Sequence, residues 1–291
     1  MAPAAVTEDQ REIIAAQNEK AKGQTVLQAI SQGISLPSIP TFTDHEKHRV
    51  WALEHMAGAF RVFSRKGFTE GMSGHISVRD PEFPHYFWTN PLGRHFGLLK
   101  ASDMILLDYS GAVVGGNRSR PANAAGFQIH AAVHKARPDV NAACHTHSKA
   151  GKAWSTFCRK LEMLNQDVCY FYGDAHAVYS EFGGIVFSQE EGDRLAAALG
   201  AKGKGLILRN HGILTVGSTV DEAAYLFTLM ERSCEVQLMA EAAAANNIEK
   251  IMVPEEAAEY TFRMASDPES LYWEHQPDLE YEYAMDDSFR D

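Results

Sequence analysis

Short strand-like runs occur in clusters along this 291-residue chain, and that grouping restricts the fold more than any other feature. Helix-like segments separate the clusters and do not alternate strictly with single strands, so the pattern favours an antiparallel or mixed sheet covered by helices over a doubly wound parallel sheet. Residues 205–209 and 213–216 are predicted to pair as a hairpin around Asn210-His211-Gly212. The other runs, separated by Gly, Asn, Pro and Asp, are 75–78, 86–89, 104–108, 112–114 and 140–147.

Capping signals mark where the helices begin. Asp44 precedes an apolar pattern with a period near 3.6, and Asn123 precedes a helix predicted to reach residue 136. Ser188 and Thr219 each stand three residues before a glutamate, which is the capping-box pattern. An earlier helical stretch is expected from about residue 8 to residue 30.

Composition divides the chain into three parts. Residues 1–42 form an N-terminal extension, and residues 43–253 form the compact domain. Residues 254–291 are both acidic and rich in aromatic side chains, which is unusual for a disordered tail. We expect this last segment to pack on its own core or on a neighbouring subunit.

Charge and cysteine use limit the possible partners and the compartment. The formal net charge of −11 disfavours binding to nucleic acid and to anionic membrane surfaces. There is no apolar run near the roughly 20 residues of a membrane helix, and no secretory signal pattern at the N-terminus. The four cysteines form no metal-binding or disulfide pattern, so buried free thiols in a reducing, cytoplasmic compartment are expected.

Two histidines stand out at the end of the predicted strand 140–147. His145 and His147 flank Thr146, and alternate side chains of a strand project from one face, so both imidazoles should point the same way. Two adjacent imidazoles provide half of a metal site. Taken alone, the pair also fits histidines that are surface-exposed or hydrogen-bonded in the core. His211, in the predicted hairpin turn, fits an ordinary turn residue equally well, and its spacing does not join it to the pair.

Five motifs in a fixed order resemble the class II aldolase and adducin head domain family, from Gly71 to about Gln237. Ordered motifs over more than half of the chain are far more specific than any one of them. They are Gly74-His75-Ile76-Ser77-Val78-Arg79; Asn90-Pro91-Leu92-Gly93 with Ala101-Ser102-Asp103; Asn123-Ala124-Ala125-Gly126-Phe127-Gln128-Ile129-His130; Ala136-Arg137-Pro138-Asp139-Val140 leading into His145-Thr146-His147; and Leu208-Arg209-Asn210-His211-Gly212.

The resemblance implies an α/β fold, an α/β/α layered domain around a central, largely antiparallel sheet, in a homo-oligomer that is often a tetramer. It implies that His145, His147 and His211 bind a divalent metal, zinc in the aldolases. Three neutral imidazoles leave positions on the cation open, as in catalytic sites, so the metal could act as a Lewis acid on a substrate oxygen. By the same resemblance, the candidate substrate-binding residues are His75, Asn90, Gly93 and Asn123.

Gly126 departs from the family pattern. The sugar-phosphate aldolases carry a glutamate here, four residues before a histidine, which shuttles the proton and can bind the metal. Glycine can do neither, and no Asp or Glu lies between Asp108 and Asp139. His130 lies one helical turn beyond Gly126 on the same side, so it is our candidate catalytic residue, with a packed core histidine as the alternative.

The predicted phosphate pocket departs from the family as well. His75 replaces the usual Asn, Leu92 replaces a hydroxyl residue, and Ala124 and Ala125 replace serines. Fewer neutral donors argue against a small phosphorylated sugar as substrate.

Three functions therefore stay open. The first is a metal-dependent carbon–carbon lyase, an aldehyde-lyase acting on a small hydroxy-carbonyl substrate. The second is a non-haem iron oxygenase on the same three histidines, since imidazole binds Fe(II) as well as zinc. The third is a non-catalytic binding or scaffold protein, because Ala125-Gly126-Phe127 resembles the adducin branch.

Overall fold

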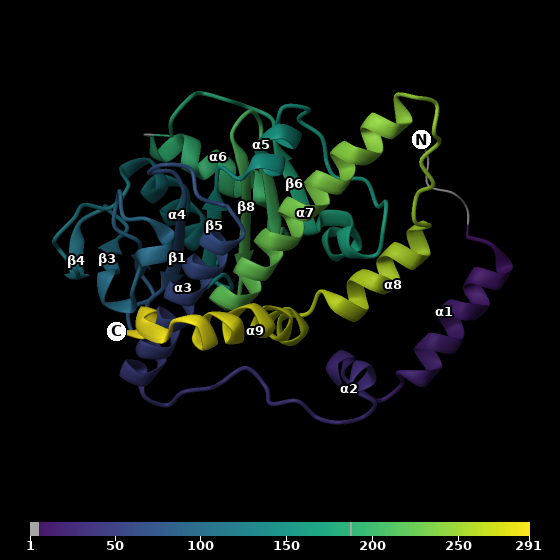
Figure 1. Ribbon diagram of the computed structural model, residues 1–291, viewed down its shortest axis with the longest axis horizontal. Coiled ribbons are helices and arrows are strands. Elements are labelled where there is room, and N and C mark those ends of the chain that lie inside the picture. Colours follow the sequence, from purple (N-terminus) through teal and green to yellow (C-terminus); the bar gives the residue numbers. More distant parts are fainter. Residues whose placement is uncertain (1–5, 187) are drawn as a thin grey trace.

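A mixed sheet of eight strands forms the centre of the computed structural model, which describes residues 6–186 and 188–291 (Figure 1). In chain order the strands are β1 (His75–Arg79), β2 (Tyr86–Thr89), β3 (Ile105–Asp108), β4 (Val113–Gly116), β5 (Ala142–Thr146), β6 (His176–Tyr179), β7 (Gly205–Leu208) and β8 (Gly212–Gly217). Their order across the sheet is β4-β3-β2-β1-β5-β8-β7-β6, and only β6 and β7 pair in parallel. The largely antiparallel sheet expected from the clustered strands is confirmed.

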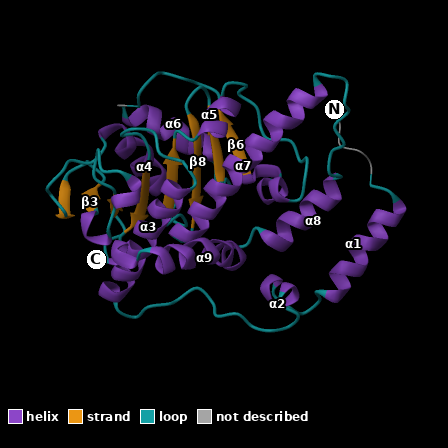
Figure 2. Ribbon diagram, viewed as in Figure 1, coloured by secondary structure: helices purple, strands orange, loops and turns teal. Residues whose placement is uncertain are grey.

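Helices cover both faces of this sheet, which gives the predicted α/β/α layers (Figure 2). Side chains alternate between the two faces, so Leu206 and Leu214 pack toward α4 and α6, whereas Ile207 and Ile213 pack toward α3 and α7. The helices of the two layers are α3 (His45–Arg65), α4 (Ala124–Ala136), α5 (Lys149–Ser155), α6 (Gln189–Leu199), α7 (Val220–Ala244) and α9 (Pro268–Met285).

The capping residues chosen from the sequence begin these helices. Asp44, Asn123, Ser188 and Thr219 each accept a hydrogen bond from a backbone N–H in the first turn of α3, α4, α6 and α7. The predicted turn between β7 and β8 is also confirmed, with Asn210 in the left-handed region at a φ of 55°.

The prediction of one helix from residue 8 to residue 30 is wrong. The segment forms two helices, α1 (Glu8–Lys20) and α2 (Val26–Ile30). Gly23 adopts a φ of 77° between them. Thr25 and Gln28 then form a reciprocal capping box that starts a new helix. α1 lies beside α8 (Glu255–Ala265), and Figure 1 shows this pair set apart from the sheet.

The C-terminal segment folds back along α3 and α7 as α9 (Figure 1). Leu279 and Phe289 are fully buried there. A methyl group at Gly58 of α3 would overlap the Leu279 side chain, so this glycine permits close approach of the two helices. Arg65 of α3 also pairs with Asp278 at 3.0 Å.

None of the helices in the described ranges is long and apolar enough to cross a membrane. The four cysteines are free thiols; Cys144, Cys169 and Cys234 are buried as expected, whereas Cys158 is partly exposed.

Replacing Leu279 by alanine should lower the free energy of unfolding by about 2–5 kcal/mol, because the change leaves a cavity between α9 and α3. Chemical denaturation measures this loss. Met285→Ala on the same helix is the matched control, since its side chain is 65% exposed, and it should change stability by less than about 0.5 kcal/mol. Equal stability of the two variants would show that α9 does not pack on this core.

Candidate metal centre and the buried histidines behind it

β5 lies between β1 and β8, and this pairing brings distant histidines together. His75 at the start of β1 lies directly opposite His145 of β5, and their ring centroids are 4.9 Å apart. Both side chains project from the face of the sheet that α4 covers, because they share the alternation of Ser77 and Ala143. The opposite neighbour, β8, begins at the turn that carries His211.

Three histidines form a compact group at this end of the sheet. His145 belongs to β5, His147 follows its last residue, and His211 lies in the β7–β8 turn. Their ligand nitrogens all lie within 4.8 Å of one another, as a shared cation requires. His147 Nε2 and His211 Nε2 face each other at 2.9 Å, compared with roughly 3.3 Å between two nitrogens on tetrahedral zinc.

The protonation of this group suits a metal ligand set. His145 Nδ1 donates to the carbonyl of Ile213 at 2.9 Å, which leaves the Nε2 lone pair free. Burial, together with the smaller effect of the neighbouring His147, lowers the pKa of His211 to about 4. Burial likewise lowers the pKa of His145 and of His147. Neutral imidazoles are the form that binds a cation, so the residues fit a divalent metal with open positions.

His75 fills the space next to Gly126. Its side chain is almost completely buried, and a methyl group at Gly126 would lie 2.5 Å from Cδ2 of the His75 ring. His75 and Gly126, which both depart from the family pattern, are therefore in contact. The His75 ring occupies the space into which a side chain at position 126 would project. The substrate-binding role of His75 stays a prediction.

The structure places His130 behind His75 rather than within the three-histidine group. His130 is 1% exposed, and its Nε2 lies 2.6 Å from His75 Nδ1. Its Nδ1 forms a short hydrogen bond with Ser77. This arrangement matches the hydrogen-bonded core histidine considered as the alternative, and a direct catalytic role for His130 stays a prediction.

The remaining predicted substrate residues lie on two loops that are bonded together. Leu92 N donates to the carbonyl of Pro121 at 2.8 Å, which joins the loop of Gly93 to the loop before α4. Asn123 uses its side-chain oxygen to cap α4, and its amide NH₂ makes no hydrogen bond among the residues that the structure describes. Asn90 is buried and only 3.5 Å from the carbonyl of Gly74. Substrate binding by these residues stays a prediction.

Sequence reasoning missed three residues around the site. Ser77 Oγ and His134 Nε2 form a hydrogen bond of 2.8 Å. Their spacing was a usable signal, because Ser77 shares a strand face with His75 and His134 shares a helix face with His130. Glu231 of α7 accepts hydrogen bonds from Ser148 and from the backbone at the start of α5, so it holds the turn that follows His147. No local signal indicates that contact, because α7 and α5 are far apart in the sequence.

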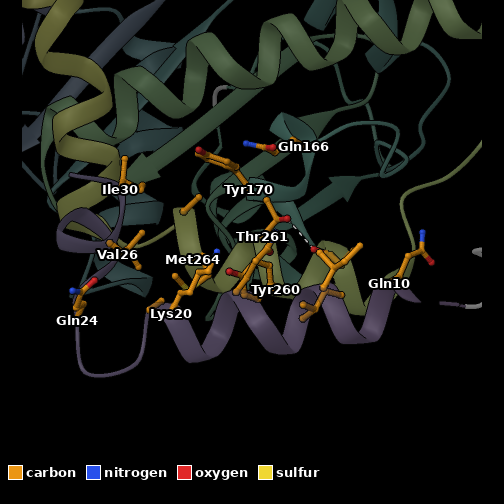
Figure 3. A pocket seen from close by; sticks show the side chains of 17 residues that line it. Gln10, Lys20, Gln24, Val26, Ile30, Gln166, Tyr170, Tyr260, Thr261 and Met264 are labelled. Carbon is orange, nitrogen blue, oxygen red and sulfur yellow. Dashed lines mark hydrogen bonds between the residues drawn. The ribbon is translucent and has the colours of Figure 1, made fainter. Parts of the chain in front are cut away.

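A cavity of about 570 Å³ lies elsewhere, between α1, α2 and α8 (Figure 3). Tyr170, Tyr260 and Met264 are among the side chains that line it. None of the candidate metal-binding or substrate-binding residues lines this cavity, so its size does not bear on the chemistry of the histidines.

Comparisons with known proteins show the family of this chain. Residues 54–238 match the family model described as Class II Aldolase and Adducin N-terminal domain. The chain is 42% identical to Decarboxylase NovR of Streptomyces niveus over 77% of this chain and 81% of that protein. It is 43% identical to a 4-hydroxy-3-prenylphenylpyruvate oxygenase/4-hydroxy-3-prenylbenzoate synthase of Streptomyces roseochromogenus subsp. oscitans, over 70% of this chain and 73% of that protein.

A solved structure, an L-fuculose 1-phosphate aldolase from Glaciozyma antarctica PI12, superimposes with a TM-score of 0.77. It is 40% identical, and the match covers 85% of this chain and 94% of that one.

Replacing His145 or His211 by alanine should abolish stoichiometric binding of a divalent metal with little loss of fold, because each change removes one of three grouped ligands. Elemental analysis measures the metal, and circular dichroism checks the fold. His85→Ala is the control, since His85 is exposed and outside the group. A variant at 145 or 211 that kept one metal per chain would remove that residue from the ligand set.

The metal-free protein should lose stability as the pH falls below about 6.5. Burial lowers the pKa of His130 and of His134 to about 3 and that of His176 to about 4. Between those values and 6.5 the unfolded chain binds protons that the folded chain does not bind. The free energy of unfolding should therefore fall by up to about 1.4 kcal/mol per pH unit for each group.

Urea denaturation at about pH 7 and about pH 5 tests this dependence. The His176→Gln variant removes one of the groups and should lose less stability between the two pH values. An unchanged difference would contradict the proposed cause.

Proposed function

Because the chain belongs to the class II aldolase and adducin family, we propose that it is a metal-dependent lyase for a small hydroxy-carbonyl substrate. The reaction makes or breaks a carbon–carbon bond next to a carbonyl group. One observation carries the proposal: three imidazoles from β5 and the β7–β8 turn hold their ligand nitrogens within 4.8 Å of one another. A set of three ligands leaves positions for substrate.

The proposed metal site gives each group a defined task. A divalent cation, zinc in our proposal, supplies Lewis acidity toward a substrate carbonyl or carboxylate oxygen when it is bound there. His145 is oriented by its bond to Ile213, and Glu231 fixes the turn after His147. These contacts keep the ligands in one arrangement while substrate enters and leaves.

The names of the similar proteins support a type of reaction, that of a lyase, and do not indicate a single substrate. The names of two of them describe decarboxylation and aldol chemistry, and both reactions cleave a carbon–carbon bond near a carbonyl group. Position 126 holds no carboxylate that could move a proton. Proton transfer must therefore use another group of this site or water. In this respect the proposed reaction differs from that of the sugar-phosphate aldolases, which use a glutamate at this position.

An iron-dependent oxygenase is the second candidate. It is favoured by the relative that is 43% identical and is named as an oxygenase. Three imidazoles bind Fe(II) as well as zinc, so the ligand set does not choose between them.

The test begins with elemental analysis of protein purified anaerobically without a metal-affinity tag. We expect near-stoichiometric zinc and zinc-dependent cleavage of hydroxy-carbonyl compounds, measured by aldehyde or CO₂ release in the absence of oxygen. His145→Ala should abolish the cleavage and His85→Ala should not. Both phosphorylated and unphosphorylated compounds belong in the screen.

Other outcomes would reject the lyase. Iron together with dioxygen uptake would favour the oxygenase. No bound metal after zinc, iron and manganese are added back would favour a binding protein without turnover. Light scattering on the same preparation tests the homotetramer that the resemblance implies.

A further inference from the structure

A continuous line of hydrogen bonds joins four buried side chains between β1 and α4. His75 Nδ1 lies 2.6 Å from His130 Nε2, and His130 Nδ1 contacts the hydroxyl of Ser77. Ser77 Oγ lies 2.8 Å from His134 Nε2, and His134 Nδ1 lies 3.4 Å from the carbonyl of Val140. Each of the four side chains is 6% exposed or less. The line therefore runs from the candidate metal centre into the interior of the protein.

The contact between His134 and the carbonyl of Val140, at the far end of the line, determines which atom of each pair carries the hydrogen. A carbonyl oxygen can only accept, so His134 Nδ1 carries a hydrogen and His134 Nε2 accepts from the Ser77 hydroxyl. Ser77 Oγ then accepts from His130 Nδ1, which leaves His130 Nε2 to accept from His75 Nδ1. Each neutral imidazole carries one N–H, so His75 Nε2 is left with a lone pair.

The neutral state of the line follows from its burial. Burial, together with the smaller effect of the neighbouring His134, lowers the pKa of His130 to about 3. Burial, together with the smaller effect of the nearby Arg79, also lowers the pKa of His134 to about 3. Both imidazoles therefore carry a single hydrogen at neutral pH.

His75 Nε2 faces the site rather than the core. A methyl group at Gly126 would lie 2.6 Å from it, so it borders the first turn of α4. Among the described residues it makes no hydrogen bond, and it is not sealed from solvent as the unpaired nitrogens of His275 are. The His75 ring also lies 4.9 Å, between ring centroids, from His145 of the three-histidine group, tilted by 33°.

We propose that Ser77, His130 and His134 fix His75 in the Nδ1–H tautomer, so that His75 Nε2 accepts a hydrogen bond from a substrate hydroxyl beside the metal centre. Ser77, His130 and His134 are positioning residues, and no proton transfer along the line is required. The proposal rests on the proposed function, since it names a feature of the substrate of that same site.

This arrangement selects the chemistry of the substrate. A lone pair attracts a hydroxyl hydrogen and repels an anionic oxygen, which has no hydrogen to donate. The part of the substrate that lies against Gly126 is therefore a neutral hydroxyl. A phosphate or carboxylate group would have to lie elsewhere in the site.

The experiment reads the tautomer directly, whether or not the protein has lyase activity. Protein labelled with ¹⁵N-histidine and loaded with zinc is studied by NMR, because the ¹⁵N shift separates protonated from unprotonated ring nitrogens. The His75→Asn variant identifies the His75 signals by their loss. We expect His75 with a protonated Nδ1 and an unprotonated Nε2 in the unaltered chain.

Ser77→Ala breaks the line without touching His75, and Ser77→Thr is the matched variant that keeps the hydroxyl. We expect Ser77→Ala to give a mixture of His75 tautomers and Ser77→Thr to retain the Nδ1–H form. A His75 Nε2–H tautomer in the unaltered chain would overturn the proposal even if both variants failed to fold. An unchanged tautomer in a folded, zinc-loaded Ser77→Ala protein would overturn the role of the line.

Glycolate and acetate test the hydroxyl contact, since they differ by one hydroxyl group. In the zinc-loaded protein, Ser77→Ala should reduce the preference for glycolate over acetate by up to about fivefold, the value of one hydrogen bond, in proportion to the loss of the Nδ1–H tautomer, and leave acetate binding unchanged. Equal preferences in both proteins would reject the hydroxyl contact. Zinc binding with the expected tautomer but no lyase activity would reject the proposed function alone.

Discussion

The pairing of β5 with β1 on one side and β8 on the other is the constraint on which the site depends. Its register sets His145 opposite His75 and directs both rings toward α4. Side chains alternate along a strand, so a slip of one residue would turn His145 toward α7 and separate it from the other histidines. The buried apolar residues on both faces fix that register, because a slip would move each of them into the opposite layer and disrupt the packing of both. The metal ligands are thus held by the packing of the whole sheet.

The two faces of the sheet carry different kinds of buried polar groups. On the side of α3 and α7, buried carboxylates are paired: Asp221 binds His55 at 2.8 Å, and Glu231 caps α5. On the side of α4, the buried polar groups near the site are neutral histidines and a serine. Carboxylates with fixed hydrogen-bond partners hold the elements in place, whereas neutral groups can form a directed line of hydrogen bonds. The layer of α3 and α7 thus holds the elements in place, and the layer of α4 contains the buried histidines next to the site.

Local signals in the sequence predicted most of the fold. Asn123 and Thr219 begin helices because their side chains satisfy backbone groups within three residues, and such contacts need no tertiary information. The break before Thr25 was not predicted; it depends on the positive φ of Gly23 and on the capping box of Thr25 and Gln28, which starts a second helix. The candidate ligands His145, His147 and His211 came together only through resemblance. The link from Ser77 to His134 depends on how α4 is rotated over β1, and spacing within one element does not give that rotation.

The contact between His75 and Gly126 also limits how this pocket can change over evolutionary time. Any side chain introduced at position 126 first meets the His75 ring, so that step strains the start of α4. Removing the ring first leaves His130 Nε2 without its partner and opens a hole beside the sheet. Either order passes through an impaired intermediate. A shift between a pocket with a carboxylate at position 126 and this pocket therefore needs paired substitutions, and this mutual dependence keeps the two versions of the site apart.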